Sequence, residues 1–262
     1  MKEPILSHLS SEYPWTDELQ YFESIPSTND FLKELARQGA PHGTVIIADH
    51  QTGGHGRMGR SFQSPAGMGV YMSILLRPCC PATELMHLTC AAAVAMCDAV
   101  QTATGLRPGI KWTNDLVFQK KKLGGILTEL GFSSKGTVDF AIIGIGINCN
   151  QTLQDFSPEI QDIAASLSMV TGKEQNRFRL AAAMMEALWK MDLSEKESIL
   201  HQYRKDCVTI GQEVSLVRGC TIRHGKALDI NENGALMVAF SETEVEAVDS
   251  GEVSIRGMYG YV

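Results

Sequence analysis

Residues 54–60 read GHGRMGR and combine three glycines with two arginines. Glycine lets backbone N–H groups approach a charged ligand closely, and arginine offers a planar fork of donors that matches a phosphate group. No aspartate or glutamate occurs from His50 to Thr83, although the chain has 30 acidic residues and a net charge of -7. We therefore predict that this loop binds an anion. The alternative is a solvated, flexible loop in which the arginines have no ligand.

The same residues fit the G-x-G-x-x-G pattern of dinucleotide-binding proteins, but the residues after them do not. That fingerprint needs a helix after the last glycine and an acidic residue about 20 positions later. Pro65 and Gly67 interrupt the segment that follows Gly59. The first acidic residue after Gly59 is Glu84. The sequence therefore argues against a dinucleotide site.

A second group of polar residues reads KWTND at residues 111–115 and is followed by KKKLGGI at residues 120–126. A lysine, an amide and a carboxylate at a turn between strands can present a cation, a hydrogen-bonding group and a magnesium ligand from one place. Alternatively, Asn114 and Asp115 only form the turn, and the lysines are solvated.

A third segment, IGIGIN at residues 143–148, places two glycines inside an apolar strand. Glycine weakens a strand unless another group packs against its bare backbone, so a ligand or a neighbouring side chain is expected there. A bulge or a close helix crossing is an equally good account. Asn148, at the end of the segment, could contact a base edge or a ribose.

The apolar pattern places these segments in an α+β fold, with a mixed sheet flanked by helices and followed by a small β-barrel that begins near Ile210. We expect two domains, at residues 1–209 and 210–262. Short turns between the strands at 116–147 imply antiparallel pairing. Strands are predicted at residues 19–25, 44–49, 70–76, 116–119, 126–132, 138–147, 213–217, 221–230, 235–240 and 253–256. Helices are predicted at residues 28–38, 83–104, 160–170 and 178–203.

Composition excludes several classes of protein. The chain has 262 residues, 44% of them hydrophobic, which is enough for a sizeable core. Its 7 cysteines show no C-x-x-C spacing, which argues against a zinc or disulfide framework and for the cytoplasm. The acidic balance disfavours nucleic-acid binding, and the apolar stretches are too short or too interrupted for a membrane span. The oligomeric state stays open, a homodimer included.

In this order and spacing, the segments resemble the catalytic domain of the biotin protein ligases, from about Leu19 to the end of the chain. That resemblance implies the mixed sheet with an SH3-like barrel after it. It also implies a reaction in two steps, with ATP and Mg²⁺ required. Biotin is first activated as biotinyl-5'-AMP, and a lysine of a biotin carboxyl carrier protein, of acetyl-CoA carboxylase or a related carboxylase, then takes the biotinyl group. The matching segments are Ser27-Thr28-Asn29, Gln51 with residues 54–60, residues 111–115, residues 122–127 and residues 144–148.

The resemblance also implies a role for each matching residue. The catalytic residues would be Lys122, Arg57 and Arg60. Biotin would be bound by Ser27, Thr28, Asn29, Gln51, Gly54, His55, Gly56, Arg57, Lys122 and Gly125. The nucleotide would be bound by Arg57, Arg60, Lys111, Trp112, Asn114, Asn148 and Arg256. Asp115 would bind magnesium. Such a site needs no protein nucleophile, because its main tasks are charge neutralisation and placement.

Two positions depart from the family pattern: His55 stands where an arginine is usual, and Phe62 where a tryptophan is usual. If the family uses only the backbone at the first position, little changes, and this is the view we favour. Otherwise Arg57 and Arg60 must neutralise the phosphate alone. Bifunctional members have a DNA-binding domain before the Ser-Thr-Asn motif, and the 26 residues at this end are too few for one, so we expect an enzyme without a repressor function.

Two other functions remain. Lipoate and octanoate transferases resemble the family in fold, but the Lys-Trp-x-Asn-Asp segment and the barrel argue against them. A noncatalytic sensor of biotinyl-adenylate is the other alternative. In the ligase, we expect the glycine-rich loop to be mobile until ligand arrives and then to shield the mixed anhydride from water.

Overall fold

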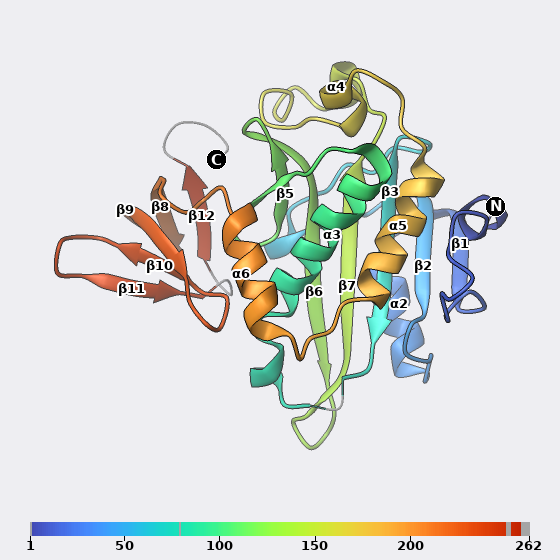
Figure 1. Ribbon diagram of the computed structural model, residues 1–262, viewed down its shortest axis with the longest axis horizontal. Coiled ribbons are helices and arrows are strands. Elements are labelled where there is room, and N and C mark those ends of the chain that lie inside the picture. The colour runs from blue at the N-terminus through green and yellow to red at the C-terminus, as the bar shows by residue number, and fades with distance from the viewer. Residues whose placement is uncertain (1, 79, 250–252, 258–262) are drawn as a thin grey trace.

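A seven-stranded mixed sheet forms the larger part of the molecule in the computed structural model, which describes residues 2–78, 80–249 and 253–257 (Figure 1). The strand order is β1-β2-β3-β7-β6-β5-β4. β1 and β2 are parallel, and the other neighbouring strands are antiparallel, as predicted for residues 116–147. The strands are β1 (Leu19–Ile25), β2 (Val45–Gln51), β3 (Gly69–Leu76), β4 (Gly109–Lys111), β5 (Asp115–Phe118), β6 (Lys121–Phe132) and β7 (Val138–Asn148).

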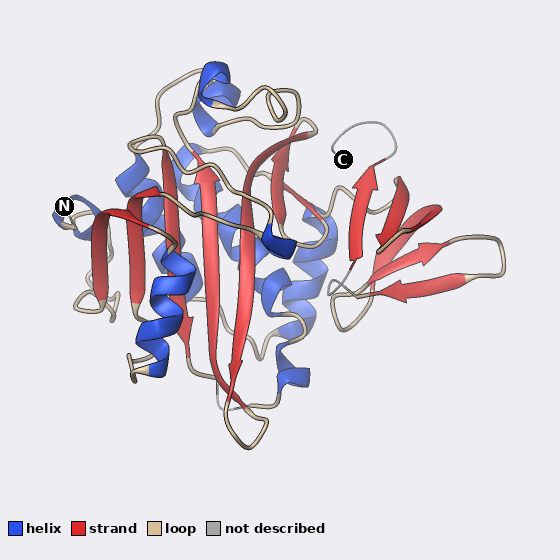
Figure 2. Ribbon diagram, turned by 180° about the vertical axis from the view of Figure 1, so that it is seen from behind, coloured by secondary structure: helices blue, strands red, loops and turns tan. Residues whose placement is uncertain are grey.

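Helices cover both faces of this sheet (Figures 1 and 2). α3 (Leu88–Thr104), α5 (Arg177–Trp189) and α6 (Lys196–Asp206) pack on one face, and α2 (Thr28–Arg37) packs on the other. Two short helices, α1 (Glu3–Leu6) and α4 (Leu167–Thr171), complete the set in the described part of the chain. Because side chains alternate along a strand, β7 contributes to the hydrophobic core on both faces of the sheet. Ile143 belongs to the larger buried cluster, and Ile142 belongs to the cluster under α2.

Helix α2 begins at Ser27, whose hydroxyl accepts a hydrogen bond from the backbone N–H of Asp30, as an N-cap does. Its apolar face buries Leu32 and Ala36 against the sheet. Its end is held by Arg77, whose guanidinium donates to the carbonyl of Ala36 at 2.6 Å. The first turn of α2 is fixed against the end of β2, because the N–H of Thr28 donates to the side-chain oxygen of Gln51 at 2.8 Å.

Helix α3 is buried on almost every side because α5, α6 and the sheet surround it. Among the described residues, the segment Ala82–Thr104 alone has the length and apolar composition of a membrane span, and 67% of its apolar 18-residue window is buried inside the protein. A core helix has the same composition, and the packing of α3 is that of a core helix.

A second sheet of five antiparallel strands follows, with the order β11-β10-β9-β8-β12. Its strands are β8 (Glu213–Arg218), β9 (Thr221–Ile230), β10 (Leu236–Ala239), β11 (Val245–Val248) and β12 (Val253–Gly257). It lies beside α6 (Figure 1), where Arg204 donates to the carbonyl of Ile230. The predicted fold class is confirmed: a mixed sheet with helices on its faces, then a small SH3-like β domain.

The helix predicted at residues 160–170 is wrong over most of its length, since only α4 is helical there. Residues 163–165 pair with β6 instead: the N–H of Lys122 donates to the carbonyl of Ile163 at 2.7 Å, and the N–H of Ala165 donates to the carbonyl of Lys122 at 2.9 Å. This pairing outweighs the helical periodicity and fixes the backbone of Lys122.

The helix predicted at residues 178–203 is two helices, α5 and α6. The break follows from Asp192, whose carboxylate accepts hydrogen bonds from the N–H and the hydroxyl of Ser194 and so forms a turn. The helix predicted at 83–104 begins as helix α3 only at Leu88, after a 3₁₀ turn at Ala82–Leu85. The short strands β4 and β11 were not predicted.

Candidate active site

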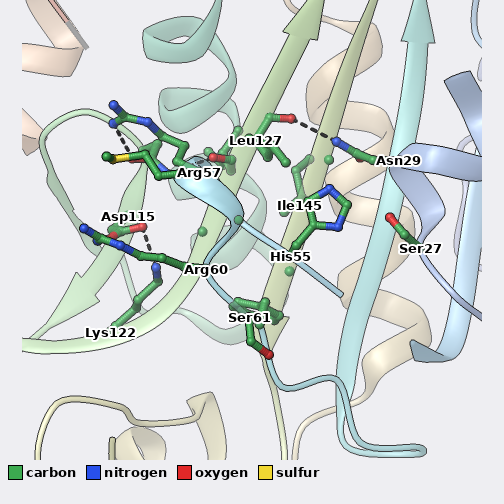
Figure 3. A pocket seen from close by; sticks show the side chains of 18 of the residues that line it. Ser27, Asn29, His55, Arg57, Arg60, Ser61, Asp115, Lys122, Leu127 and Ile145 are labelled. Atoms are coloured by element: carbon green, nitrogen blue, oxygen red, sulfur yellow. Dashed lines mark hydrogen bonds and ion pairs between the residues drawn. The ribbon is translucent and has the colours of Figure 1, made fainter. Parts of the chain in front are cut away.

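One cavity of about 430 Å³ collects most of the predicted site residues. It lies on the α2 side of the sheet, where the loop that follows β2 crosses the strands (Figure 2), and Figure 3 shows its side chains. Its wall includes Ser27, Thr28, Asn29, Gln51, His55, Gly56, Arg57, Arg60, Lys111, Trp112, Asn114, Asp115, Lys122 and Gly125, all named from the sequence. The sheet therefore brings together segments that lie far apart in the sequence.

One end of the cavity is neutral, and hydrogen bonds hold its side chains in place. The carbonyl oxygen of the Gln51 side chain accepts from the N–H of Thr28 at 2.8 Å and from its hydroxyl at 3.1 Å. The buried hydroxyl of Ser73 on β3 donates toward both Thr28 and Asn29. Asn29 in turn donates to the carboxylate of Glu129 at 2.8 Å. The amides and hydroxyls at this end therefore have fixed orientations before any ligand binds.

The glycines of β7 make room for two cavity side chains. A Cβ atom on Gly144 would collide with the side-chain amide of Asn29, and one on Gly146 would lie 2.5 Å from the ring of Phe62. The expectation that a group packs against these bare glycines is therefore confirmed. The bare backbone lets the amide and the aromatic ring lie flat on the sheet.

The glycine-rich loop forms an irregular ribbon over the sheet. The N–H of Phe62 donates to the carbonyl of Gly54 at 2.9 Å, and the N–H of Gly56 donates to the carbonyl of Arg60 at 2.8 Å. A short 3₁₀ turn at Arg57–Gly59 closes the tip, with Gly59 at φ 69°. No helix follows the last glycine, since the described chain runs on to β3, in agreement with the rejection of a dinucleotide site.

The other end of the cavity is charged. Lys122 Nζ lies 2.7 Å from Asp115 Oδ1, and Figure 3 shows the two side chains facing each other with Arg60 beside them. Arg57 donates to the side-chain oxygen of Asn114 at 3.3 Å. Burial lowers the pKa of Arg57 below its ordinary value, opposed by the nearby Asp115 carboxylate, but an arginine remains charged at neutral pH. This end can therefore neutralise an anion.

Gly125 lies beneath the ion pair. A Cβ atom there would lie 3.2 Å from Asp115 Oδ1 and 3.3 Å from Lys122 Nζ. Asn114 is held from the same strand, because its amide donates to the carbonyl of Ile126 at 2.8 Å. The carboxylate, the amide and the lysine thus meet above one glycine of β6.

Two predicted residues do not line the cavity, and the side chain of a third is not described. Gly54 lies just outside, packed against the carbonyl of Phe62. Asn148 is buried, and its amide donates to the carbonyl of Ala165 at 3.1 Å. Arg256 is on β12, and its side chain lies outside the described residues. Arg77, the third arginine in the stretch from His50 to Thr83 that lacks acidic residues, caps α2 instead.

Sequence reasoning missed the residues that orient the neutral end. Ser73 was a usable signal, because it is the one polar residue in the apolar run at residues 70–76 apart from the tyrosine hydroxyl. Glu129 gave no comparable signal, since a glutamate in a strand is ordinary on a solvated face. Its partner Lys33 lies 2.8 Å away and comes from α2. Only the packing of α2 on the sheet brings these residues together.

Comparison with known proteins gives two family matches. Residues 21–148 match the model described as "Biotin/lipoate A/B protein ligase family", and residues 209–256 match "Biotin protein ligase C terminal domain". The bifunctional ligase/repressor BirA of Bacillus subtilis is 37% identical over 232 residues, covering 86% of this chain and 70% of that protein. The biotin--[acetyl-CoA-carboxylase] ligase of Mycobacterium tuberculosis is 30% identical over 239 residues, covering 87% of this chain and 85% of that protein.

Among solved structures, the biotin protein ligase from Aquifex aeolicus in complex with biotin and ATP is similar, with a TM-score of 0.77 and 30% identity. The match covers 91% of this chain and 98% of that chain. The apo structure of the same ligase aligns with a TM-score of 0.72 and 28% identity. The similarity thus extends over both sheets.

Proposed function

The chain belongs to the biotin protein ligase family, and we propose that biotin and ATP meet in this cavity, with biotin at the neutral end and the phosphates at the charged end. The protein is an ATP-dependent ligase that joins biotin to an acetyl-CoA carboxylase. The carrier domain of that carboxylase, with its acceptor lysine, is the proposed protein substrate. The observation that supports the placement is the division of one cavity into a neutral and a charged end.

The neutral end suits the ureido head of biotin. A buried ureido group must keep hydrogen bonds to its carbonyl oxygen and its two N–H groups. The hydroxyl of Ser27 accepts from the Asp30 N–H and keeps its own hydrogen for a carbonyl acceptor. The side-chain oxygen of Asn29 accepts from Ser73 and has a second lone pair for an N–H donor. These two residues are the proposed partners of the ureido head.

The charged end suits the carboxylate of biotin and the α-phosphate of ATP. Both are anions, and bringing them together costs repulsion that Lys122, Arg57 and Arg60 would offset. Lys111 and Trp112 line the same end and are proposed to contact the nucleotide. Removing one such contact in the transition state costs about 2.7–4 kcal/mol when it resembles an oxyanion-hole donor.

Magnesium fits the donors at this end. Among the described residues, no group of three or more histidine, cysteine or acidic side chains is placed to hold a metal ion. Mg²⁺ in ATP sites is usually held by one or two carboxylates together with phosphate oxygens. The Asp115 carboxylate, on the cavity wall, would supply the protein ligand. When bound, the ion would neutralise phosphate charge.

The ion pair of Lys122 with Asp115 suggests that Lys122 exchanges Asp115 for the biotin carboxylate when the substrates bind. At 2.7 Å the carboxylate holds the ammonium group at the charged end. Once Asp115 is engaged elsewhere, Lys122 would turn to the biotin carboxylate, while the backbone bonds of Lys122 to residues 163–165 keep its base in place. The biotin oxygen then attacks the α-phosphate and pyrophosphate leaves. In the second step the acceptor amine attacks the biotinyl carbonyl and AMP leaves.

Mass spectrometry tests this proposal directly. A biotin carrier domain incubated with the protein, biotin, ATP and Mg²⁺ should gain one biotinyl group on its acceptor lysine. The variant Lys122→Met should lose this activity by about a hundredfold or more. Lys121→Met is the matched control, because Lys121 is next in sequence and does not line the cavity.

Two outcomes would contradict the proposal. Modification by lipoate in place of biotin would show that the neutral end recognises another head group. Binding of biotinyl-adenylate without any pyrophosphate exchange would show a sensor in place of a ligase.

We also propose a cytoplasmic location. The six cysteines in the described part of the chain are all free, and four of them are buried, which fits a reducing compartment. Fractionation of the native host, followed by detection of the protein in the soluble or the exported fraction, tests this.

A further inference from the structure

The segment that ends β4 is fastened from outside the first sheet. The backbone N–H of Trp112 donates to the hydroxyl of Thr209 at 2.9 Å, and its indole N–H donates to the carbonyl of Gly234 at 3.0 Å. Thr209 lies between α6 and β8, and Gly234 lies in the turn between β9 and β10. Both bonds are buried. Trp112 in the cavity wall is thus bonded to the second domain at Gly234 and to the segment that leads into it at Thr209.

Two more bonds hold the same segment. The hydroxyl of Tyr203 on α6 donates to the carbonyl of Thr113 at 2.9 Å, and the N–H of Val208 donates to the carbonyl of Ile110 at 2.9 Å. Tyr203 is fully buried, and burial raises its pKa well above the ordinary value, so it remains a donor over the physiological pH range. Three of the residues 110–113, namely Ile110, Trp112 and Thr113, are therefore hydrogen-bonded to partners outside the first sheet, and Lys111 between them lines the cavity.

The turn that reaches Trp112 is itself rigid. The side-chain oxygen of Asn231 accepts from the N–H of Asn233 at 2.9 Å and from that of Ala235 at 3.0 Å. Gly234 has φ +83°, and a Cβ atom there would lie 2.9 Å from the sulfur of Cys90 on α3. The carbonyl that receives the indole N–H therefore has little freedom to move.

These contacts reach only one end of the cavity. Lys111, Trp112, Asn114 and Asp115 belong to or follow directly on the fastened segment and line the charged end. The residues of the neutral end come from α2 and β2 and are bonded to β3 and β6. A change at Thr209 should therefore act on one substrate and spare the other.

We propose that Thr209 is a positioning residue for ATP, which sets nucleotide affinity separately from biotin affinity. This inference rests on the proposed function, because it takes the charged end as the nucleotide end. Thr209 touches no substrate in this account. Its hydroxyl fixes the backbone at Trp112, and that backbone orients Lys111 and Asn114 toward the phosphates.

The test compares Thr209→Val and Thr209→Ser with a matched control, Thr104→Val. Thr104 at the end of α3 also accepts a backbone N–H, that of Leu106 at 3.1 Å, and does not line the cavity. Removing either hydroxyl leaves a backbone donor unpaired. The assays are biotin-dependent ATP–pyrophosphate exchange for the KM of ATP, titration calorimetry for the Kd of biotin, and thermal unfolding.

For Thr209→Val we expect the KM of ATP to rise about tenfold, as for one lost bond to a buried donor, with the Kd of biotin within twofold of the unaltered protein. Thr209→Ser should restore the KM of ATP. Thr104→Val should lower Tm but leave both constants unchanged. This pattern supports the inference, because a merely structural loss would affect the two substrates alike.

An unchanged KM of ATP in Thr209→Val overturns the inference, and so does an equal weakening of ATP and biotin. If the unaltered protein shows no biotin-dependent exchange at all, the proposed function fails and this inference fails with it. The two failures are therefore distinguished by the unaltered protein.

Discussion

The substitution Gly144→Ala tests whether Asn29 recognises the ureido head of biotin. Gly144 is on β7 and has no side chain, and the amide of Asn29 occupies the space that a Cβ atom would need. The nearest heavy atoms are all in that amide, which is anchored by Ser73 and Glu129. Alanine at this position must therefore displace the Asn29 side chain.

The size of the effect follows from the bonds that Asn29 makes. Overpacking a dense core by one methyl group costs about 1–3 kcal/mol. Moving the amide also weakens its bonds to Ser73 at 2.5 Å and Glu129 at 2.8 Å, and each bond contributes about 1 kcal/mol. We expect the free energy of biotin binding to weaken by about 2 kcal/mol, which is roughly thirtyfold in Kd.

Titration calorimetry of biotin, without ATP, measures this Kd directly. Gly131→Ala is the matched control, because its Cβ atom would collide with the ring of Phe140, outside the cavity. Both variants should unfold at lower temperature, but only Gly144→Ala should bind biotin more weakly. A Gly144→Ala protein that binds biotin as tightly as the unaltered protein would refute the role assigned to Asn29.

Three further changes have defined outcomes. Arg57→Gly should release biotinyl-adenylate, seen as biotinylation of lysines on a bystander protein by streptavidin blot; unaltered retention counts against the assignment of Arg57 to the phosphate. Asp115→Asn should raise the Mg²⁺ concentration for half-maximal pyrophosphate exchange by about tenfold or more, as for a lost ligand contact, and an unchanged Mg²⁺ titration would remove Asp115 from the metal site. Burial lowers the pKa of His87 below 6.5, so the unfolded chain binds more protons and stability is lost as pH falls below 6.5. Thermal unfolding of His87→Gln between pH 7.5 and 5.5 should show a smaller loss of Tm than the unaltered protein, and an equal loss would exclude His87 as a cause.

The sequence was informative where the presence of a residue type at a given position has few physical explanations. A glycine inside an apolar strand has few, and at Gly144 and Gly146 the explanation is the packing of Asn29 and Phe62 on the bare backbone. β1 and β9 were also predicted with the bounds that the structure shows. Local rules were sufficient at these positions because the cause is local.

The sequence was uninformative where a residue acts through a distant partner. Thr209 contacts Trp112 across 97 positions, and Asn29 contacts Glu129 across 100. The wrong prediction of a helix at residues 160–170 has the same cause. The apolar residues there do recur at helical spacing, but the backbone is hydrogen-bonded to Lys122 on β6 instead. Periodicity describes which face of a segment is apolar, and it says nothing of which neighbouring backbone competes for its hydrogen bonds.

His55 stands where the family usually has an arginine, and its place in the cavity shows what this difference changes. Its ring nitrogen Nδ1 lies 3.2 Å from the carbonyl of Gly53 and 3.9 Å from the carboxylate of Asp30 in the first turn of α2. Figure 3 places the ring beside Ile145, toward Ser27, with Arg57 and Arg60 on the opposite side. The side chain at this position therefore faces the neutral end, where a phosphate is not expected. Histidine in place of arginine here removes no cation from the charged end, so in the proposed function the loop would neutralise the phosphate through Arg57 and Arg60.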